Sequence, residues 1–444
     1  MNKKLKIALK RRSSEQGFAI PIAVGLGLVM ILIAATMIVR SQGDQITASA
    51  QKSTAQSLSV AEAGVTRVQQ FLNKYRSFAT VNYPWSSYVT NTTSGLGCST
   101  SSSLYTEAQA LDDWQPIGTG DDRFRVVSYT YNVTNTTTNT GQGTLVLEGQ
   151  SRQGTTVKST TKLQVNIPVQ RNLTPSFPPP GVWARSYTLG NNDFVTDAVI
   201  DAGCTSSITS AQETSNFSPV TAGGTVKFIR DPSLTLPGPQ SVPTQCPSPG
   251  SFTNANKPCA IHITGPINST QTFPRTTDMA TSPTGYGTAG TGINGEYIYY
   301  ITKGSGTNSV NLAGSDKITI TAGKKVTFYL QGNFNATGSS DIIHNCTAGT
   351  GCSPTNFQIF GGNDTTEILI RGNSTIDAFI FAPNASNSGI NGTGQLRGSM
   401  WIKGWNASSA NHVVLSQTGA WDNVPQFLRP PNINATTSWE RQML

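Results

Sequence analysis

The chain has 444 residues, and only 12% of them are Asp, Glu, Lys or Arg, about half the ordinary share. Its length leaves room for two or three domains. Gly, Ser, Thr and Asn take up the missing fraction, and such short polar side chains favour turns and exposed strand faces over helices. This composition excludes a mostly helical protein and predicts a mainly β one.

The formal net charge of +8 is distributed unevenly along the chain. Most of the excess lies before a hydrophobic segment, in Lys3, Lys4, Lys6, Lys10, Arg11 and Arg12. A membrane protein keeps its cytoplasmic positive charge in that position. The remaining charges nearly balance, so we do not expect nucleic-acid binding.

Residues 1–17 form a basic leader that ends in Gly17, and residues 18–39 contain no ionisable side chain. Twenty-two helical residues span about 33 Å, enough to cross the hydrocarbon core of a bilayer. The run is longer than the apolar region of a secretory signal, and no A-x-A cleavage site follows it. We predict a transmembrane helix; on these facts alone an ordinary signal anchor is an equal alternative.

Residues 41–76 continue the helical pattern with apolar side chains on one face and polar ones on the other. The apolar residues recur at steps of three and four and are Leu58, Ala61, Val65, Val68, Leu72 and Tyr75. One long helix over residues 18–76 is therefore expected, transmembrane first and amphipathic afterwards.

Three features of this region resemble the type IV pilin superfamily: the basic leader, the Gly17–Phe18 junction that opens an apolar helix, and the segment AEAG at 61–64. The last resembles a segment of PilX-type minor pilins and of the K-type pseudopilin of type II secretion. The resemblance implies cleavage by prepilin peptidase after Gly17 and methylation of the new terminus at Phe18. It also implies that the helix packs with other pilins in a filament core.

One residue departs from the family pattern. Major pilins carry a glutamate five residues after the cleavage junction, where this chain has Ile22. K-type pseudopilins also lack it and lie at the filament tip, so the resemblance implies a tip or priming role. The alternative is an inefficiently processed membrane protein. Pro21, in the first turn of the mature helix, and Gly25 and Gly27 suit helix bundling, although any membrane helix tolerates them.

The pattern changes to strands after residue 77. Residues 124–133, 143–153 and 156–169 predict an antiparallel meander laid across the amphipathic helix, a pilin-like α/β head over 77–169. Three consecutive prolines in 170–181 cannot belong to a paired strand, so we place a linker there.

Residues 182–421 are predicted to form an extracytoplasmic β-rich domain, and 422–444 an extended tail. Short apolar runs ended by Gly or Asn recur here, as in 317–335, 357–363, 367–386 and 394–405. This spacing favours a parallel β-solenoid, with a β-sandwich as the alternative. Part of this region, 376–386 and 392–404, also resembles β-helix-like domains of bacterial pilin-like and cell-envelope proteins.

Six cysteines follow the hydrophobic segment, which is compatible with disulfides in an exported region. Proximity in sequence favours the pairs Cys346–Cys352 and Cys246–Cys259, leaving Cys98 and Cys204, but fifteen connectivities stay open. A zinc site is disfavoured because no CxxC pair exists and His262, His344 and His412 are the only histidines. We expect no metal and no cofactor.

We do not expect an enzyme, because acidic residues of the β-rich region are sparse: Asp316, Asp341, Asp364, Glu367 and Asp377. A binding function is the stronger rival. Trp401, Trp405 and Trp421 could form an aromatic platform for polysaccharide or a surface together with Tyr297, Tyr299, Tyr300 and Tyr329, or these side chains could fill the core.

The sequence thus predicts a structural minor pilin or pseudopilin of a type IV pilus or related secretion system. Its precursor would lie in a bacterial inner membrane with a cytoplasmic N-terminus, and the assembled subunit would be periplasmic, extracellular or pilus-associated. Its expected partners are other pilins, prepilin peptidase and the membrane. The alternative is a single-span surface adhesin or polysaccharide-binding protein outside any filament.

Overall fold

The structure is a computed structural model. It describes residues 3–92, 96–135, 140–171, 180–189, 193–195, 198–204, 208–215, 217–218, 227–247, 258–278, 297–344, 353–372, 375–392, 395–406, 413–415, 428–429 and 431–442.

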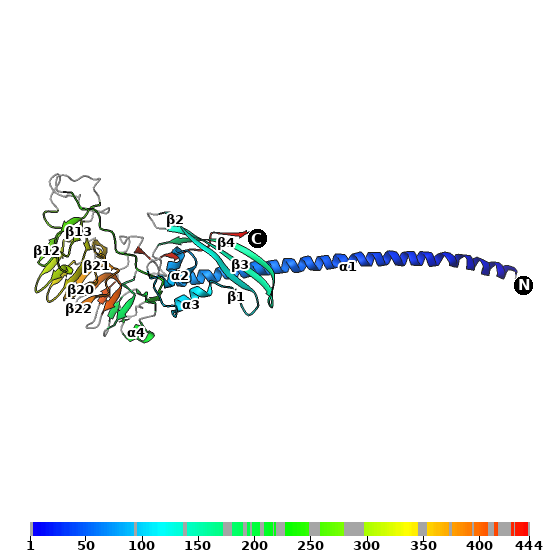
Figure 1. Cartoon of the computed structure of the whole chain (residues 1–444), viewed down its shortest axis with the longest axis horizontal. Helices are drawn as coiled ribbons and strands as arrows, with labels where there is room; N and C mark the ends of the chain where they lie inside the picture. The colour runs from blue at the N-terminus through cyan, green and yellow to red at the C-terminus, as the bar shows by residue number, and fades with distance from the viewer. Residues whose placement is uncertain are drawn as a thin grey trace.

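One helix, α1 (Lys3–Lys74), runs through the transmembrane and amphipathic segments without interruption. Its N-terminal part projects as a rod, away from every sheet (Figure 1). Its C-terminal part packs against the antiparallel sheet described next, and Val65, Val68 and Leu72 have no exposed surface. The predicted apolar stripe is therefore confirmed as the buried face of the helix.

The C-terminal end of α1 and an antiparallel sheet form the first part of the molecule, which we call the head. The sheet order is β1-β2-β3-β4-β26, and β27 also pairs with β4. The predicted meander is confirmed, with all pairings antiparallel. The elements of the head are η1 (Arg76–Thr80), α2 (Trp85–Thr90), α3 (Ser103–Ala110), β1 (Gln115–Pro116), β2 (Arg123–Asn135), β3 (Thr140–Gln153), β4 (Thr156–Gln170), β26 (Asn432–Ile433) and β27 (Ser438–Gln442).

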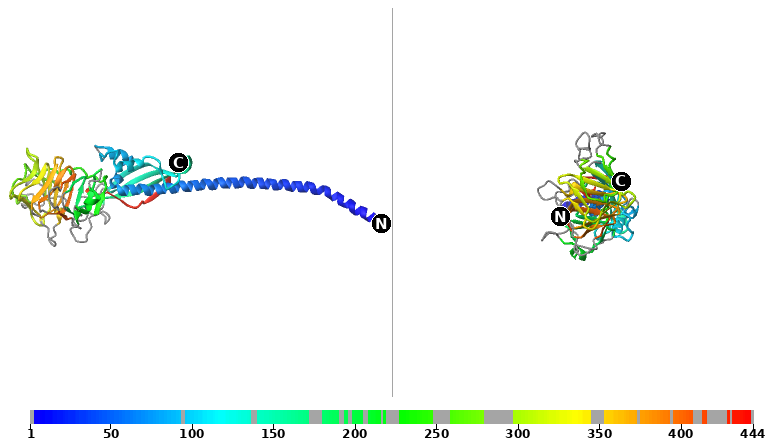
Figure 2. Two further views of the ribbon diagram at one scale, coloured as in Figure 1. Left: turned by 90° about the horizontal axis from the view of Figure 1, so that it is seen from below. Right: turned by 90° about the vertical axis from the view of Figure 1, so that its left-hand side faces the viewer.

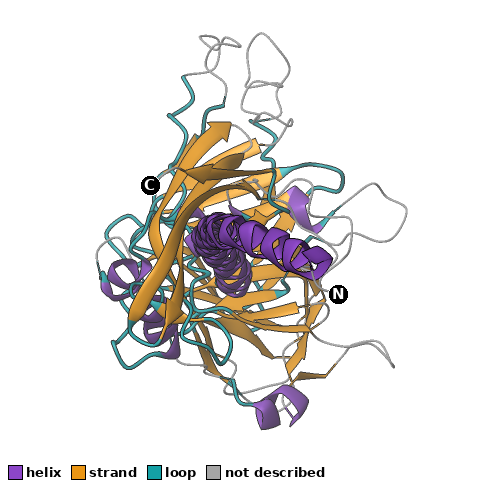
Figure 3. Ribbon diagram, turned by 90° about the vertical axis from the view of Figure 1, so that its right-hand side faces the viewer, coloured by secondary structure: helices purple, strands orange, loops and turns teal. Residues whose placement is uncertain are grey.

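Small residues let the helix and the sheet approach closely. A Cβ atom on Gly149 of β3 would collide with the Ser57 carbonyl oxygen and the Ala61 nitrogen, both in the backbone of α1. A Cβ on Gly64 would lie 2.7 Å from the Phe124 ring of β2. The segment 61–64 therefore has a packing role in the head, and the sheet curves around this side of the helix (Figure 3).

The C-terminal segment, predicted as an extended tail, is extended and also belongs to the head. Ile433 pairs with Val169, and Trp439 pairs with Val165, both antiparallel on β4. The chain leaves the head after β4 and returns to the same strand at its end, so residues 171–431 are an insertion into the head.

This insertion is built from parallel strand pairs. The large sheet has the order β10-β8-β5-β23-β21-β19-β16-β13-β11, and smaller sheets have the orders β12-β15-β18 and β14-β17-β20-β22-β24-β6. Its strands are β5 (Val182–Ala184), β6 (Ser186–Thr188), β7 (Asp193–Val195), β8 (Ala198–Asp201), β9 (Phe217–Ser218), β10 (Lys227–Arg230), β11 (Ile261–Ile263), β12 (Gln271–Phe273), β13 (Tyr297–Ile301), β14 (Asn308–Leu312), β15 (Lys317–Ile320), β16 (Val326–Leu330), β17 (Asn333–Ala336), β18 (Asp341–Ile343), β19 (Phe357–Gly361), β20 (Glu367–Gly372), β21 (Thr375–Ala382), β22 (Asn387–Gly392), β23 (Gln395–Ile402), β24 (Gly404–Asn406) and β25 (Val413–Leu415), and short helices are α4 (Ser210–Ser215) and η3 (Pro354–Asn356).

The order of strands in space differs from their order in the chain. β5, β8 and β10 lie at the end of the large sheet that faces the head, and β11 and β13 lie at the far end (Figures 1 and 2). From β13 to β23 the chain then returns toward the head, strand by strand. A segment that we call the strap, residues 231–245, connects the two ends.

The large sheet buries side chains on both faces. One face contributes Phe328, Ile359 and Ile380 to an interior core shared with the smaller sheets. The other face carries Trp183, Phe360, Phe379, Phe381 and Trp401, which pack with Leu234 of the strap and with Leu428. The Trp183 indole donates to the Leu234 carbonyl at 3.0 Å, so the strap is fixed on the outer face.

A disulfide and a buried carboxylate join the head to the insertion. Cys98 of the head is bonded to Cys204 of the insertion. Asp231, at the start of the strap, accepts the Arg76 backbone N–H at 3.1 Å, and the Ser233 hydroxyl accepts the Ser77 N–H at 3.3 Å. Two N–H groups at the start of η1, which the short helix itself cannot satisfy, thus find acceptors on the other part of the molecule.

Cys246 and Cys259 form the second disulfide, at the far end of the strap. This pairing and the Cys98–Cys204 pairing agree with the predicted ones. The third predicted pair, Cys346 and Cys352, lies outside the described residues.

We expect the two disulfides to differ in their effect on stability. Cys98–Cys204 spans 106 residues and Cys246–Cys259 spans 13. Because the longer loop restricts the unfolded chain more, replacing both cysteines by serine should cost about 4–5 kcal/mol for the first pair and about 3 kcal/mol for the second. Denaturant unfolding of the two double variants measures the difference, and a larger loss from the shorter loop would contradict it.

The contact between the head and the insertion should also depend on pH, because Asp231 is part of it. Burial raises the pKa of this carboxyl to about 6, against the opposing effect of its hydrogen bonds from Ser233 and Arg76. The folded protein therefore favours the neutral acid. The resulting contribution to the free energy of unfolding is complete below about pH 4 and is lost as the pH rises through 6. We expect the free energy of unfolding of the wild type, relative to Asp231→Ala, to fall by about 2–2.5 kcal/mol between pH 4 and 7.

Denaturant unfolding of both proteins across this range measures the change. Asp121→Ala is a matched control, since Asp121 is an exposed carboxylate on a turn of the head. A difference between wild type and Asp231→Ala that stays flat with pH would rule out titration of this group.

Candidate functional site

The first candidate site is the apolar part of α1 that the head does not cover. Between residues 20 and 39 the large side chains are about half to two-thirds exposed: Ile20, Ile22, Val24, Leu26, Leu28, Val29, Met30, Ile31, Leu32, Ile33, Met37, Ile38 and Val39. This segment is long and apolar enough to cross a membrane. An apolar surface of this size in water would be very unfavourable, so a lipid or protein environment must cover it.

All the predicted processing and packing residues lie within α1. Gly17 and Phe18 are helical, and Pro21 follows them in the same helix. Ile22 is 55% exposed, and a Cβ atom on Gly25 or Gly27 would meet nothing within 4 Å. These glycines leave a shallow place on the rod where another helix could approach.

The exposed surface of α1 continues past the apolar segment to the edge of the head. An open groove of about 530 Å³ lies beside the start of β4, and its lining residues are Gln42, Gln45, Ile46, Ser49, Ala50, Ser53 and Lys158. Ile46 is 71% exposed within it. The surface available to a partner therefore changes from wholly apolar to mixed where the helix meets the sheet.

The predicted aromatic platform is wrong for two of its three tryptophans. Trp401 and Trp405 are buried, the first on the outer face of the large sheet and the second in the interior core. Trp421 lies outside the described residues. Burial of Trp401 and Trp405 supports the alternative role of filling the core.

The fold brings together three polar side chains that are far apart in the sequence. Asp377 on β21 is fully buried and accepts the Arg397 guanidinium of the neighbouring strand β23 at 2.8 Å. His344 contacts the Asp377 carbonyl oxygen through its Nδ1 atom. Burial lowers the pKa of His344, which favours the neutral imidazole. These residues belong to separate segments of the chain, so the sequence gives no local signal that they meet.

Two other acidic residues of the insertion form partly exposed ion pairs. Asp364 lies 2.8 Å from Lys303, and Asp341 lies 3.5 Å from Lys317. Among the described residues, no group of three or more His, Cys, Asp or Glu side chains could hold a metal ion. His262 is half-buried on β11 and stacks edge-on against Tyr300 at 5.0 Å.

A second cavity lies at the corner where β13, β16 and β19 end. Its volume is about 390 Å³, and the lining includes Gln240 of the strap, Tyr300, Gln331, Asn363 and Asp364. The walls of this cavity come from four separate segments of the chain, so no local pattern in the sequence predicts it. The sequences GN and GGN follow two of these strands. They predict turns at the strand ends, but they do not predict that these turns share a cavity.

Comparison with known proteins gives one match. A domain family of unknown function (DUF7305) matches residues 307–417, about a quarter of the chain, from the start of β14 to just beyond β25. No curated protein and no solved structure matches the chain. The matched region contains the Asp377–Arg397 pair and one part of the corner cavity, Leu330, Gln331 and residues 362–364, but neither Tyr300 nor the strap.

Proposed function

We propose that this chain is a minor pilin or pseudopilin, a structural subunit that assembles through its N-terminal helix. The observation that carries the proposal is the continuity of α1. One helix has an exposed apolar half and then supports an antiparallel sheet. A membrane anchor alone needs only the first half, whereas a filament subunit needs a rigid rod that fixes the head at a defined distance from the core.

The insertion supports a position at the end of a filament. It lies beyond the head, on the side opposite the N-terminus (Figures 1 and 2). Ile22 gives no carboxylate to neutralise the terminal amine of a subunit ahead of it, and an unpaired charge in an apolar core would be costly. A tip or priming subunit has no such neighbour, so both features agree with that position.

We further propose that the insertion is a β-solenoid. Parallel pairing of Tyr297 with Val326, Val326 with Phe357, Gln358 with Phe379 and Thr375 with Gln395 supports it. Each step of about 20 to 30 residues adds one strand to each of two sheets, which is the geometry of stacked coils. The sandwich alternative requires antiparallel hairpins, which these pairs do not provide.

The location follows from the same proposal. Basic residues before the apolar segment support a cytoplasmic N-terminus. One disulfide that joins the head to the insertion and another within the insertion support an oxidising compartment for the rest of the chain. We therefore place the head and the insertion outside the cytoplasmic membrane.

Mass spectrometry of the N-terminal peptide from native membranes or sheared filaments tests the proposal. We expect a peptide that begins at N-methylated Phe18 in the wild type, and an uncleaved leader in Gly17→Val. Gly43→Val is a matched control, since a Cβ at Gly43 meets nothing within 4 Å, and it should be processed normally. An intact leader in the wild type, or cleavage after residue 39, would leave the single-span adhesin as the remaining function.

A further inference from the structure

The corner cavity between the strap and the ends of β13, β16 and β19 is open to solvent and has a mixed lining. Pro239, Gln240, Ser241 and Val242 of the strap form one wall. Residues 330–331 and 362–364, together with Tyr300, form the opposite wall. Its volume of about 390 Å³ lies within the range typical of small-molecule sites.

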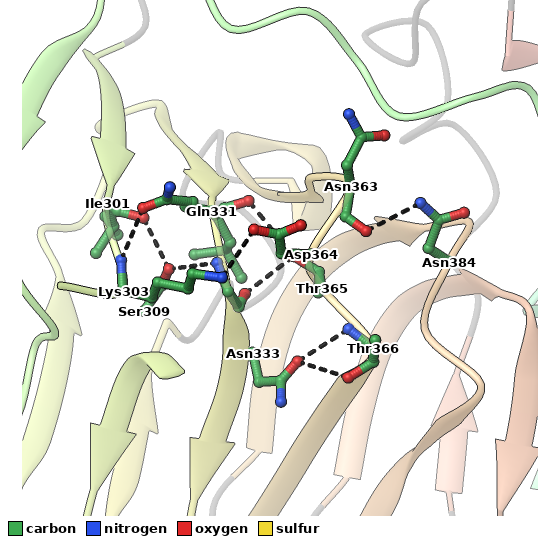
Figure 4. A network of polar contacts seen from close by, with 12 residues as sticks. Ile301, Lys303, Ser309, Gln331, Asn333, Asn363, Asp364, Thr365, Thr366 and Asn384 are labelled. Carbon is green, nitrogen blue, oxygen red and sulfur yellow. Dashed lines mark hydrogen bonds and ion pairs between the residues drawn. The ribbon is translucent and has the colours of Figure 1, made fainter. Parts of the chain in front are cut away.

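The wall opposite the strap is held in place by its own hydrogen bonds (Figure 4). The Gln331 Oε1 atom accepts the Lys303 backbone N–H at 3.1 Å. The Lys303 ammonium contacts Asp364 Oδ2 at 2.8 Å, and the Thr365 hydroxyl donates to the Gly332 carbonyl at 2.9 Å. A ligand would therefore meet a largely preformed surface, which lowers the entropic cost of binding.

The groups that this surface offers are neutral amides and a ring. The Asn363 carbonyl accepts the Asn384 amide at 3.3 Å, while the Asn363 side chain is exposed and points away from the Lys303–Asp364 pair (Figure 4). Gln240 adds a second amide from the facing strap. The Tyr300 ring is half-buried and fixed by its edge-on contact with His262.

The electrostatics of the cavity exclude a strongly charged ligand. Asp364 is the carboxylate of its lining, and the Lys303 ammonium neutralises it. A phosphate or carboxylate ligand would find no unpaired cation in this lining, and a cationic ligand would have to compete with Lys303.

We propose that this cavity binds a neutral saccharide, one or two sugar units in size. A sugar hydroxyl both donates and accepts hydrogen bonds, and an amide side chain does the same, so Asn363 and Gln240 match it from opposite walls. The Tyr300 ring provides an apolar face with a polar tip for the C–H side of a sugar ring. This site depends only on the insertion and does not rest on the proposed assembly function.

Saturation-transfer NMR on the full chain, in a detergent without a sugar headgroup, tests the proposal. The probes are maltose, lactose, cellobiose and chitobiose, with sialyllactose as an anionic comparison. We expect at least one neutral disaccharide to bind with a Kd in the range of about 0.1–5 mM, and sialyllactose to bind no better than lactose. Loss of one amide partner in Asn363→Ala or Gln240→Ala should weaken binding about tenfold.

Asn311→Ala is the matched control, because Asn311 is an exposed asparagine on β14 outside the cavity. It should bind within about twofold of the wild type, and all three variants should keep the wild-type Tm within a few degrees. The proposal is overturned if none of the neutral disaccharides binds. It is also overturned if binding is unchanged in both Asn363→Ala and Gln240→Ala.

Discussion

Replacing Asp377 by alanine should destabilise the insertion by about 3–5 kcal/mol, the cost of leaving one partner of a buried ion pair alone. The Asp377 side chain has no exposed surface and lies 2.8 Å from the Arg397 guanidinium, which is only 20% exposed. Without the carboxylate, the guanidinium keeps its charge among parallel strands that exclude water. Denaturant unfolding of the full chain measures the loss.

Two comparisons separate this effect from simple loss of packing. Asp377→Leu combined with Arg397→Met removes both charges and should recover most of the stability, because an apolar pair of similar volume carries no desolvation cost. Asp341→Asn breaks the exposed pair with Lys317 and should cost less than about 1 kcal/mol. Hydrogen exchange should place the loss of protection in β19, β21 and β23; a loss of less than 1 kcal/mol in Asp377→Ala would contradict the prediction.

Gly149→Val should separate the antiparallel sheet from α1. Its side chain would have to occupy space taken by the Ser57 carbonyl oxygen and the Ala61 nitrogen. Both are backbone atoms of a helix, so they cannot rotate away as the end of a flexible side chain would. We expect a loss of about 3 kcal/mol, at the upper end of overpacking effects in protein cores.

Gly120→Val is the matched control, because it makes the same glycine-to-valine change at a position with open space around it. A Cβ at Gly120, in the turn before β2, meets nothing within 4 Å, so this variant should unfold within about 0.5 kcal/mol of the wild type. Near-ultraviolet circular dichroism reports the environment of the buried Trp85 and Tyr129 in the head. An unchanged spectrum and stability in Gly149→Val would mean that the helix shifts to accept the side chain.

The parts of the fold that depend on local periodicity were predictable. Val65, Val68 and Leu72 follow a helical period, and their burial confirms it. The three strands of the meander alternate over 13 to 15 residues, and their boundaries agree with the predicted ones within a few residues. In both cases one face is buried and the other is not, so the pattern is visible in the sequence itself.

The predicted binding role of Trp401 and Trp405 was wrong for a physical reason. Both faces of the large sheet are buried, one in the interior core and one under the strap. Alternate side chains of β23 therefore point into two different cores, and neither set faces solvent. The sequence pattern around Trp401 thus does not show that its side chain is buried. The strap that covers it comes from residues 231–245, far away in the chain.

The order of the strands was also beyond prediction. Sequence order suggests that stacking begins beside the head at β5 and moves outward. Instead β5 lies between β8 and β23, because the strap carries the chain to the far end before most of the stacking begins. For the same reason, no local pattern in the sequence predicts that Asp377 and Arg397 lie side by side on β21 and β23, with His344 beside them.

The return of the last strands to β4 has a consequence for how the protein is made. β26 and β27 close the edge of a sheet whose other strands emerge more than 260 residues earlier. Synthesis proceeds from the N-terminus, so a ribosome that stops early releases a head with one open edge. An unpaired strand edge invites aggregation and proteolysis. β26 and β27 can therefore cover this edge only after the whole insertion has been synthesised.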